Sequence, residues 1–563
     1  MSCIIKLWNY QNKTMRKIIA IFFVLPFFSL AQNNSGDIHG DFDLSLQTYN
    51  EDESIGALAA DEVILNNAYL NLLYTKGKFT VGVRYESYLN AKADYDPEFR
   101  GNGIPYRFAQ YNNDGLEITA GSFYEQFGSG LIFRSYEEKN LGIDNAMDGI
   151  RLKYSPINGM YFKTFIGKSR THFTYADGIF RGIDGELNIN DLFRFESKTK
   201  AIIGGSFVSR YQKRENIIFN IPQNVSAYAS RLNVIHGGWN YYSEFACKIN
   251  DPANSLSESS MNYAKGGAFT NSITFSRKGF GVSAEIHRTD NMTFKSDRDK
   301  DGKAFLINYI PTLSKPHAYS LLALYPCATQ TDGEFGMQFD IFYKFQKGTL
   351  LGGEYGTKLD VNYSRINGLN GGNSFLNDHT EHTPMLISIK DEDLYFNDIN
   401  LEINKKFSKK IKANFIIANQ TYNKDFLEGH AEGDYGVLNS TILITDVTYK
   451  IKKGHSIRIE LQKLNSKQLE HAEELAEGDW SMGLIEYTIS PNWFFTVQDM
   501  YNWGNEDVDK QLHYININAG FIKGANRFSI GYGKKREGIF CVGGICKLVP
   551  SSNGFSLNIS SSF

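Results

Sequence analysis

The sequence lacks the features of several protein classes. After the first 31 positions it has no run of about 18 apolar residues, so no membrane-spanning helix is predicted there. It also lacks a strong charge of either sign: 59 Lys and Arg face 62 Asp and Glu, a net charge of -3. A nucleic-acid partner is therefore not predicted. It contains no G-x-S-x-G motif and no spacing that sets a base beside a nucleophile, so we predict neither enzymatic activity nor a cofactor.

The first residues have the pattern of a cleaved export signal. Arg16 and Lys17 precede the apolar run Ile18–Leu30, and a small-x-small cleavage site ends at Ala31. We therefore expect a signal peptide over 1–31 and a single mature domain over 32–563. Met15 is an alternative start. No Cys follows the cleavage site, so a lipoprotein anchor is not expected.

Aromatic residues are abundant although the mean hydropathy is low, at -0.35. The 33 Tyr and 41 Phe are typical of alternating strands with aromatic girdles at membrane interfaces. A secreted β-rich adhesin would also be rich in aromatic residues. The composition therefore favours a membrane barrel but does not by itself distinguish it from such an adhesin.

Alternation of apolar and polar residues is the strongest signal in the chain. Phe339, Ile341 and Tyr343 share one face of a strand, and Gln338 and Asp340 share the other. The closing stretch 555–563 alternates in the same way and ends on Phe563. A final strand that ends in Phe resembles the closing strand of bacterial outer-membrane barrels, where the barrel-assembly machinery reads it.

Short turns and long loops alternate along the chain. Short turns are expected at 75–78, 276–279, 346–349, 408–410, 452–455, 490–492 and 523–526. Longer polar loops separate them, for example at 366–393, 424–437, 466–479 and 503–509. We therefore predict an all-β fold: a large transmembrane antiparallel β-barrel of about 26 strands, within a range of about 22–26, with short periplasmic turns and long extracellular loops.

The charges of turns and loops support this orientation. The short turns are basic, for example at Lys409, Lys410, Lys452 and Lys453, and the long loops are acidic. Basic turns can contact anionic headgroups of the inner leaflet. Outer-membrane lipids are thus expected partners.

One stretch, 121–149, breaks the strand periodicity and combines aromatic, glycine and charged residues. We predict that it folds into the lumen as a constriction or partial plug. It would present Arg134, Glu137, Asp144 and Asp148 at the narrowest point. The alternative is an ordinary outer loop.

This stretch and the segment 540–554, which precedes the last strand, resemble an uncharacterised family of porin-like outer-membrane proteins, known as a domain of unknown function. The resemblance covers nearly the whole mature chain. It implies a barrel fold and an outer-membrane location. It implies no substrate and no catalytic residue.

The predicted function is a porin-like channel for unidentified solutes, restricted by infolded loops 121–149 and 366–393. Its lumen would be lined by polar residues, namely Glu402, Asp446, Lys450, Arg458, Glu460 and Glu486. One alternative is a non-conducting scaffold that binds a surface lipoprotein or secretion machinery. Another is a secreted soluble β-protein.

Three smaller patterns complete the sequence. Cys541 and Cys546 flank a Gly-rich turn and are a candidate disulfide in an exported protein. Asp297, Asp299 and Asp301 have the spacing of a calcium loop, but Asn308 stands where the twelfth-position Glu would be, so a solvated hairpin loop is favoured. Asp378, His379, Glu381 and His382 could hold a transition metal, but the sequence shows no further ligand cluster. We therefore predict no metal site.

Overall fold

The computed structural model describes residues 36–213, 222–249, 251, 265–300, 302–369, 389, 391–469, 472–474 and 476–563. The predicted export signal, Asp301, and the pair His379 and His382 lie outside the described residues. So does most of the predicted infolded loop 366–393.

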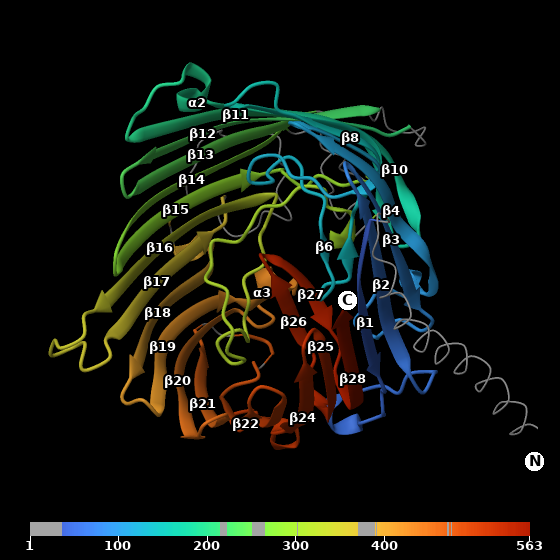
Figure 1. Ribbon diagram of the computed structural model, residues 1–563. Coiled ribbons are helices and arrows are strands. Elements are labelled where there is room, and N and C mark those ends of the chain that lie inside the picture. The colour runs from blue at the N-terminus through green and yellow to red at the C-terminus, as the bar shows by residue number, and fades with distance from the viewer. Residues whose placement is uncertain are drawn as a thin grey trace, which may run out of the picture.

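Twenty-four antiparallel strands form one closed barrel (Figure 1). Alternating apolar and polar residues produce these strands, because one face of each strand points outward and the other into the lumen. In order around the wall, the strands are β1 (Asp37–Gln47), β2 (Leu65–Lys76), β3 (Phe79–Tyr88), β4 (Gly101–Asn113), β5 (Leu116–Phe123), β8 (Met147–Tyr154), β9 (Met160–Thr171), β10 (Thr174–Asn188), β11 (Thr199–Tyr211), β12 (Asn224–His236), β13 (Trp239–Ile249), β14 (Gly266–Arg277), β15 (Phe280–Asp290), β16 (Gly333–Phe345), β17 (Thr357–Asn367), β18 (Leu394–Lys406), β19 (Ile411–Asn423), β20 (Val437–Lys452), β21 (His455–Gln468), β22 (Trp480–Ile489), β23 (Trp493–Tyr501), β24 (His513–Lys523), β25 (Asn526–Lys535) and β28 (Ser552–Ser562).

The first and last strands close the wall. β1 pairs with β28 over Asp41–Gln47, and β28 pairs with β25 on its other side. Gly40 and Phe563 extend this closure by exchanging two backbone N–H···O hydrogen bonds of 2.9 Å. The predicted all-β barrel is confirmed, and its 24 strands fall inside the predicted range.

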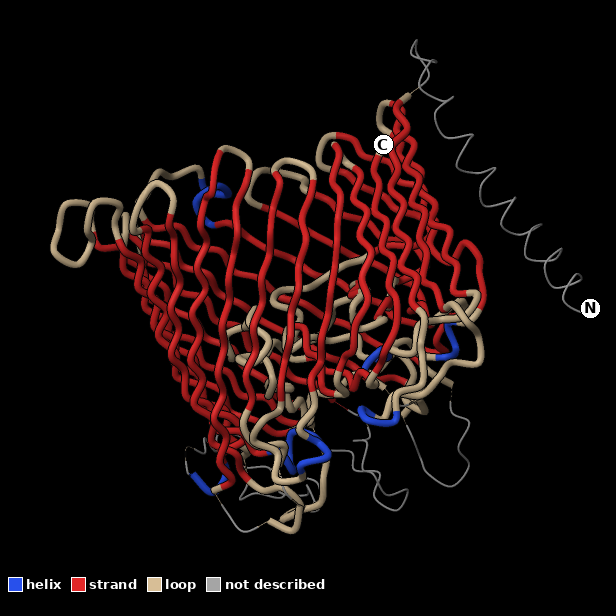
Figure 2. Tube along the Cα trace, turned by 90° about the horizontal axis from the view of Figure 1, so that it is seen from below, coloured by secondary structure: helices blue, strands red, loops and turns tan. Residues whose placement is uncertain are grey.

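The two ends of the barrel differ (Figure 2). One end, the short-turn end, carries turns such as 77–78, 237–238 and 453–454. All the turns predicted from the sequence lie there, and the one at 346–349 extends to 356. The other end, the long-loop end, carries loops such as 48–64 and 424–436, although the turn 172–173 there is short.

The described helices are short. They are η2 (Glu53–Ile55), η3 (Pro97–Phe99), α2 (Ile189–Phe193), η4 (Lys303–Phe305), η5 (Asp391–Asp393), α3 (Lys424–Glu428) and η6 (Val508–Lys510). Among the residues that the structure describes, no helix is both long and apolar enough to cross a membrane.

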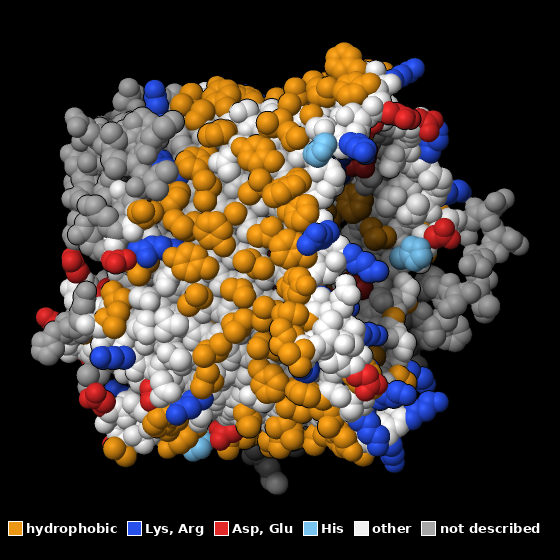
Figure 3. All heavy atoms as spheres, turned by 90° about the vertical axis from the view of Figure 1, so that its left-hand side faces the viewer, with side chains coloured by type: hydrophobic (Ala, Val, Ile, Leu, Met, Phe, Trp, Pro, Cys, Tyr) orange, Lys and Arg blue, Asp and Glu red, His pale blue; other side chains and the backbone are white. Residues whose placement is uncertain are grey.

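The outer face of the wall is apolar. On β23, Trp493, Phe495 and Val497 are exposed outward, while Phe494 and Thr496 alternate with them and face the lumen. Figure 3 shows hydrophobic side chains spread across the outer wall on the left-hand side of Figure 1. This outward apolar surface is what a barrel wall needs in order to contact lipid.

The hydrophobic core lies inside the barrel, nearer the long-loop end. Three connections turn inward there rather than outward: 124–146 between β5 and β8, 291–332 between β15 and β16, and 536–551 between β25 and β28 (Figures 1 and 2). These are called the infolded segments below. The first contains the small hairpin of β6 (Glu137–Glu138) and β7 (Ile143–Asp144). The third contains the hairpin of β26 (Gly538–Val542) and β27 (Ile545–Val549).

Candidate functional site: a lumen filled by the chain itself

The first two infolded segments are joined by hydrogen bonds. The backbone N–H of Arg134 donates to the carbonyl of Ile307 at 2.6 Å. The side-chain amide of Asn308 donates to the carbonyl of Leu131 at 3.2 Å, and that of Asn145 to the carbonyl of Leu306 at 2.6 Å. Because these bonds satisfy buried backbone groups, the two segments form one body rather than two independent loops.

The third segment packs against the other two. The backbone N–H of Thr329 donates to the carbonyl of Gly544 at 2.9 Å. Ile545 of the β26–β27 hairpin forms a small buried cluster with Leu141 and Ile143 of the first segment. A disulfide joins Cys541 and Cys546 across this hairpin. The sequence had proposed this pair as a candidate disulfide.

Two larger apolar clusters anchor the segments to the wall. In one, Leu321 and Leu322 pack with the lumen-facing wall residues Ile442 and Leu464. In the other, Phe127, Phe133, Ile307 and other side chains of the segments pack against lumen-facing residues of β5 to β14. Apolar side chains that face a lumen gain stability only where something covers them. The clusters therefore hold the segments in place by hydrophobic burial.

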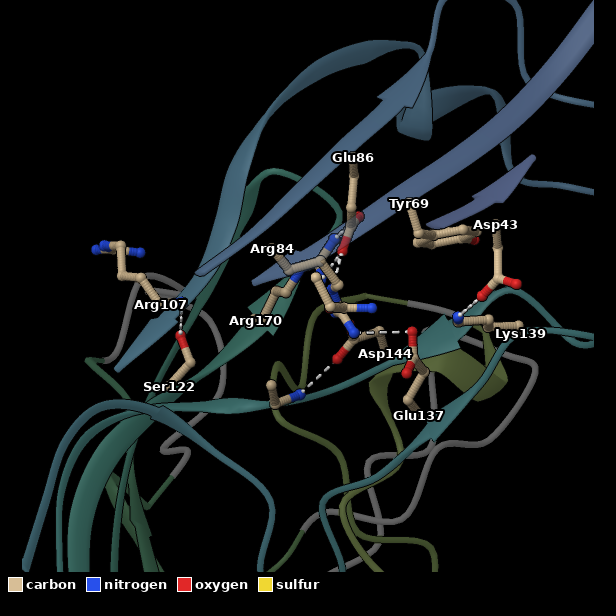
Figure 4. Close-up of polar contacts among 12 residues, drawn as sticks. Asp43, Tyr69, Arg84, Glu86, Arg107, Ser122, Glu137, Lys139, Asp144 and Arg170 are labelled. Carbon is tan, nitrogen blue, oxygen red and sulfur yellow. Dashed lines mark hydrogen bonds and ion pairs between the residues drawn. The ribbon is translucent and has the colours of Figure 1, made fainter. Parts of the chain in front are cut away.

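An ionic cluster links the first segment to the wall (Figure 4). It consists of Arg84 and Glu86 on β3, Arg170 on β9, and Glu137 and Asp144 on the β6–β7 hairpin. The guanidinium of Arg84 lies 2.7 Å from Glu86 and 2.9 Å from Glu137, and it also contacts Asp144. Arg170 pairs with Glu86 at 2.5 Å and with Asp144. Buried charges paired in this way fix the hairpin in one position.

Burial changes the acidity of the groups on this hairpin. The pKa of Glu137 is raised above its usual range, chiefly because burial disfavours its charged form. The positive charge of Arg84 opposes this rise, and the negative charge of Asp144 adds to it. The pKa of the Tyr124 hydroxyl is also raised, again chiefly by burial. This hydroxyl donates to Asp144 at 3.0 Å.

Three of the four predicted constriction residues lie in the lumen. Glu137 and Asp144 belong to the ionic cluster. Arg134 lies against the aromatic rings of Tyr136 and Tyr309, with its guanidinium carbon 3.9 Å from the centre of the second ring. These groups hold the segments together through ion pairs and cation–π contacts.

The prediction for Asp148 is wrong. Asp148 lies on β8, where alternation puts it on the outer face with Ile150, whose side chain is 56% exposed. Its carboxylate accepts a hydrogen bond from Tyr175 at 2.7 Å and lies 3.3 Å from Arg107. Figure 4 shows the Arg107 side chain pointing away from Arg84 and Arg170. The sequence had treated 121–149 as one unit, whereas its last residues already belong to the wall.

The residues predicted to line the lumen lie on lumen-facing positions of β18, β20, β21 and β22. Arg458 pairs with Asp446 at 3.0 Å and also contacts Glu460. Glu402 lies 3.3 Å from Lys315, which comes from the second infolded segment. Glu486 alternates with the outward-facing Ile485. Lys450 occupies the same face as Asp446, nearer the short-turn end.

Asp297 and Asp299, two of the three aspartates with calcium-loop spacing, have protein partners. The carboxylate of Asp297 is buried and accepts hydrogen bonds from Gln212 at 2.8 Å and from the backbone of Asp299 at 3.1 Å. Lys295 and Leu306 form an antiparallel bridge around this stretch, and Asp299 between them is exposed, so this part of the second infolded segment is a hairpin loop in which Asp297 is buried. Over the described ranges, no group of three or more His, Cys, Asp and Glu side chains is arranged to hold a metal ion.

Sequence reasoning missed two of the three infolded segments. The stretch Ala318–Cys327 was one available signal, since it is largely apolar without strand alternation. The paired glycines Gly543 and Gly544 were another. Both have positive φ, and a Cβ on Gly543 would lie 1.8 Å from the Tyr309 hydroxyl. Only glycine fits such a close approach between two segments.

The chain belongs to DUF6029, a family of unknown function, whose model matches residues 15–563. No curated protein sequence is similar to it.

Several solved barrels are similar to the structure. The siderophore receptor PirA from Pseudomonas aeruginosa is 9% identical, with 95% of this chain and 81% of that chain covered and a TM-score of 0.40. OccK3 (OpdO) from the same organism is 13% identical, with 78% and 98% covered and a TM-score of 0.34. The P pilus usher (PapC) translocation pore is 9% identical, with 93% and 98% covered and a TM-score of 0.37. At these TM-scores, none of them assigns a function or a location to this chain.

Proposed function

For this member of DUF6029, we propose the function of an outer-membrane, porin-like channel whose lumen is restricted by the three infolded segments. The observation that carries the proposal is the row of ionisable side chains that faces the lumen on neighbouring strands. It runs through Asp360, Glu402, Asp446, Glu460 and Glu486. Arg458 pairs with Asp446 and Glu460, and Lys315 pairs with Glu402, so the row keeps an excess of negative charge. Such an excess needs water or counterions around it. A hydrated lumen over this part of the wall is therefore the simplest reading.

The outer face supports a membrane location. Apolar residues alternate outward on strands all around the barrel, including Val83 on β3, Ile341 on β16 and Ile517 on β24. A soluble protein rarely exposes so large a continuous apolar surface. Together with the export signal expected over 1–31, this supports the outer membrane rather than secretion. Outer-membrane lipids and, during biogenesis, the barrel-assembly machinery are then the expected partners.

The infolded segments support a restricted channel rather than an open one. They occupy the part of the lumen nearer the long-loop end and are fixed by the apolar and ionic contacts described above. A wall of 24 strands without such filling would enclose a wide aqueous channel. The half of the lumen at the short-turn end, together with the part lined by the row of ionisable side chains, would then form the wide part of the channel.

Conductance measurements test this function. We would record purified protein in planar bilayers and compare it with a variant in which a short Gly-Ser linker replaces residues 292–331. The variant should conduct several-fold more than the wild type. A matched control shortens the exposed loop 505–510 and should leave the conductance unchanged. A variant that still migrates as a heat-modifiable barrel but conducts no more than the wild type would overturn the proposal.

A second candidate function is a non-conducting scaffold for a surface lipoprotein or secretion machinery. The observation that favours it is the apolar packing of the segments against lumen-facing wall residues, which resembles a permanent core. A stable complex after native purification, together with a conductance that stays near zero in the 292–331 replacement, would favour the scaffold. Neither function assigns an enzymatic role or a cofactor to the chain.

A further inference from the structure

A cavity of about 600 Å³ remains between the barrel wall and the infolded segments. It is bounded on one side by β25, β28, β1 and β2, where the barrel closes, and on the other by the first and third segments. We call it the seam cavity. Its volume lies within the range of pockets that hold small organic ligands, roughly 300–1,000 Å³.

Cationic side chains outnumber carboxylates in the seam cavity. Two carboxylates line it, and each has a lysine partner: Asp43 lies 3.1 Å from Lys139, and Asp94 lies 3.7 Å from Lys92. The remaining cations on the lining are Arg527, Lys535 and Arg536. Five cations against two carboxylates give the lining a formal charge of +3 (5 − 2). This local excess contrasts with the net charge of -3 of the whole chain.

The surplus cations have few carboxylate partners within the described residues. Arg536 approaches Glu477 at 3.8 Å and donates to the backbone carbonyls of Glu537 and Leu324, and Arg527 lies over the ring of Phe494. Among the described residues, no carboxylate lies within 4.0 Å of Lys535 or Arg527. A low-dielectric wall strengthens the field of such charges, which attracts an anion into the space between them.

The cations are also distributed along the route of a solute. Arg527 follows the turn 524–525 at the short-turn end of β25, and Lys535 ends the same strand at the long-loop end. Hydrogen-bonding groups lie between them, including the Ser529 hydroxyl and the Asn558 amide. A solute in the seam cavity would therefore meet cations at both ends and polar groups in between.

We propose that the seam cavity binds a small organic anion with a carboxylate or phosphate group and a polar body. The anion would be the class of solute that the proposed channel carries. The binding proposal rests on the channel function only because the channel would be the way by which the anion reaches the cavity. Because Arg527 and Lys535 lie at opposite ends of β25, they mark two positions for the acidic group, and at either one a charge-assisted hydrogen bond holds it. Serine and asparagine side chains of the wall hold the polar body.

Direct binding tests the proposal. The full chain, purified in detergent micelles, is titrated by calorimetry with citrate and with glucose 6-phosphate; glucose and spermidine serve as the neutral and cationic comparisons. At least one anion should bind, and the one that binds more tightly identifies the preferred acidic group. R527Q/K535Q should weaken that binding by at least about tenfold, because the charged donor is lost at both positions that the acidic group can occupy.

The matched control is K344Q/K358Q. It removes two lysines from lumen-facing positions of β16 and β17, on the opposite side of the barrel, and should change the affinity less than about twofold. Binding of neither anion, equal binding by the wild type and R527Q/K535Q, or equal binding of glucose would overturn the proposal. These outcomes are independent of conductance. If the protein binds the anion but does not conduct, only the channel function is disproved. If it conducts but does not bind the anion, only the proposal of anion binding in the seam cavity is disproved.

Discussion

The guanidinium of Arg84 on the wall lies 2.9 Å from the carboxylate of Glu137 on the first infolded segment. The two residues are 53 positions apart in the chain, and Arg84 is almost completely buried. This contact connects the barrel wall to the first infolded segment. The position of the segment therefore depends on a charge that the wall supplies.

Replacing Arg84 by Met should release the β6–β7 hairpin. Glu86, Glu137 and Asp144 would then face Arg170 alone, and loss of one partner from a buried ionic network typically costs about 3–5 kcal/mol. A cysteine replacing the buried Leu141, in a chain whose native Cys247 and Cys327 are serine, would report the release through faster thiol labelling.

The matched control for this substitution is Arg107→Met. Arg107 lies beside Asp148 on the outer face of the wall and makes no contact with the hairpin carboxylates. Its replacement should leave the labelling rate at position 141 unchanged. Equal rates in the two variants would show that Arg84 does not hold the hairpin.

Acidification should tighten the docking of the same hairpin. The ionic cluster has two arginines and three carboxylates, a formal charge of -1 (2 − 3), so one proton would neutralise it. The pKa of Glu137 is raised by burial when the hairpin is docked. The docked state thus holds this proton more tightly than the released state. The resulting stabilisation is present below the ordinary pKa of a glutamate and is lost as the pH rises through the raised value.

Thiol labelling at position 141 measures this effect when each rate is divided by that of a cysteine at the exposed position 508. The normalised rate in the wild type should fall from neutral to acidic pH. In Glu137→Gln, which imitates the protonated form, it should be low and nearly constant. A pH dependence that persists unchanged in Glu137→Gln would assign the titration to another group.

The sequence predicted the strands of the barrel wall better than the infolded segments inside it, and the reason is physical. An apolar outer face and a polar lumen face impose a period of two, so Ile341 and Asp340 reveal opposite faces without further information. The infolded segments pack mainly against protein and follow no such period. The backbone of Leu321 donates to the side chain of Gln462 at 2.9 Å, a contact across 141 positions that no local pattern encodes. Asp148 was misplaced because one position decides which face a strand residue occupies.

Replacing Gly543 by Ala should separate the third infolded segment from the second. A Cβ at this position would lie 1.8 Å from the Tyr309 hydroxyl, and the φ of +57° is already unfavourable for alanine. The native Cys327 reports the separation, since it is buried on the second segment and burial raises the pKa of its thiol. In a Cys247→Ser chain, labelling of Cys327 should become several-fold faster.

The substitution Gly524→Ala distinguishes the effect of backbone strain at positive φ from the effect of the collision with Tyr309. Gly524 has a φ of +61° but nothing within 4 Å of its Cβ position, so alanine there meets the same backbone strain without the collision. It should leave the labelling of Cys327 unchanged. If both substitutions accelerate labelling equally, backbone strain rather than the Tyr309 contact is responsible.

Phe563→Ala should reduce the amount of assembled barrel. The ring of Phe563 packs over Gly40 on the outer face, where a Cβ on the glycine would lie 2.5 Å from it, and the backbones of the two residues complete the closure. Without the ring, Gly40 is no longer covered, and the signal that the assembly machinery is expected to recognise is lost. Heat-modifiable barrel in the membrane fraction should fall several-fold. Phe555→Ala, on the outward face of the same strand, is the control and should assemble nearly normally.

An arginine on the outer face should lower the free energy of unfolding far more than a polar substitution on the lumen face. Ile485 is 52% exposed on the outside of β22, and the next residue, Glu486, faces the lumen. In a bilayer, Ile485→Arg puts a charge into hydrocarbon at a cost of about 2–4 kcal/mol near the midplane, whereas Glu486→Gln stays in a polar environment. Reversible folding into lipid vesicles, followed by urea titration, measures both. Equal stabilities would mean that this face does not contact lipid, and the membrane assignment would fail with it.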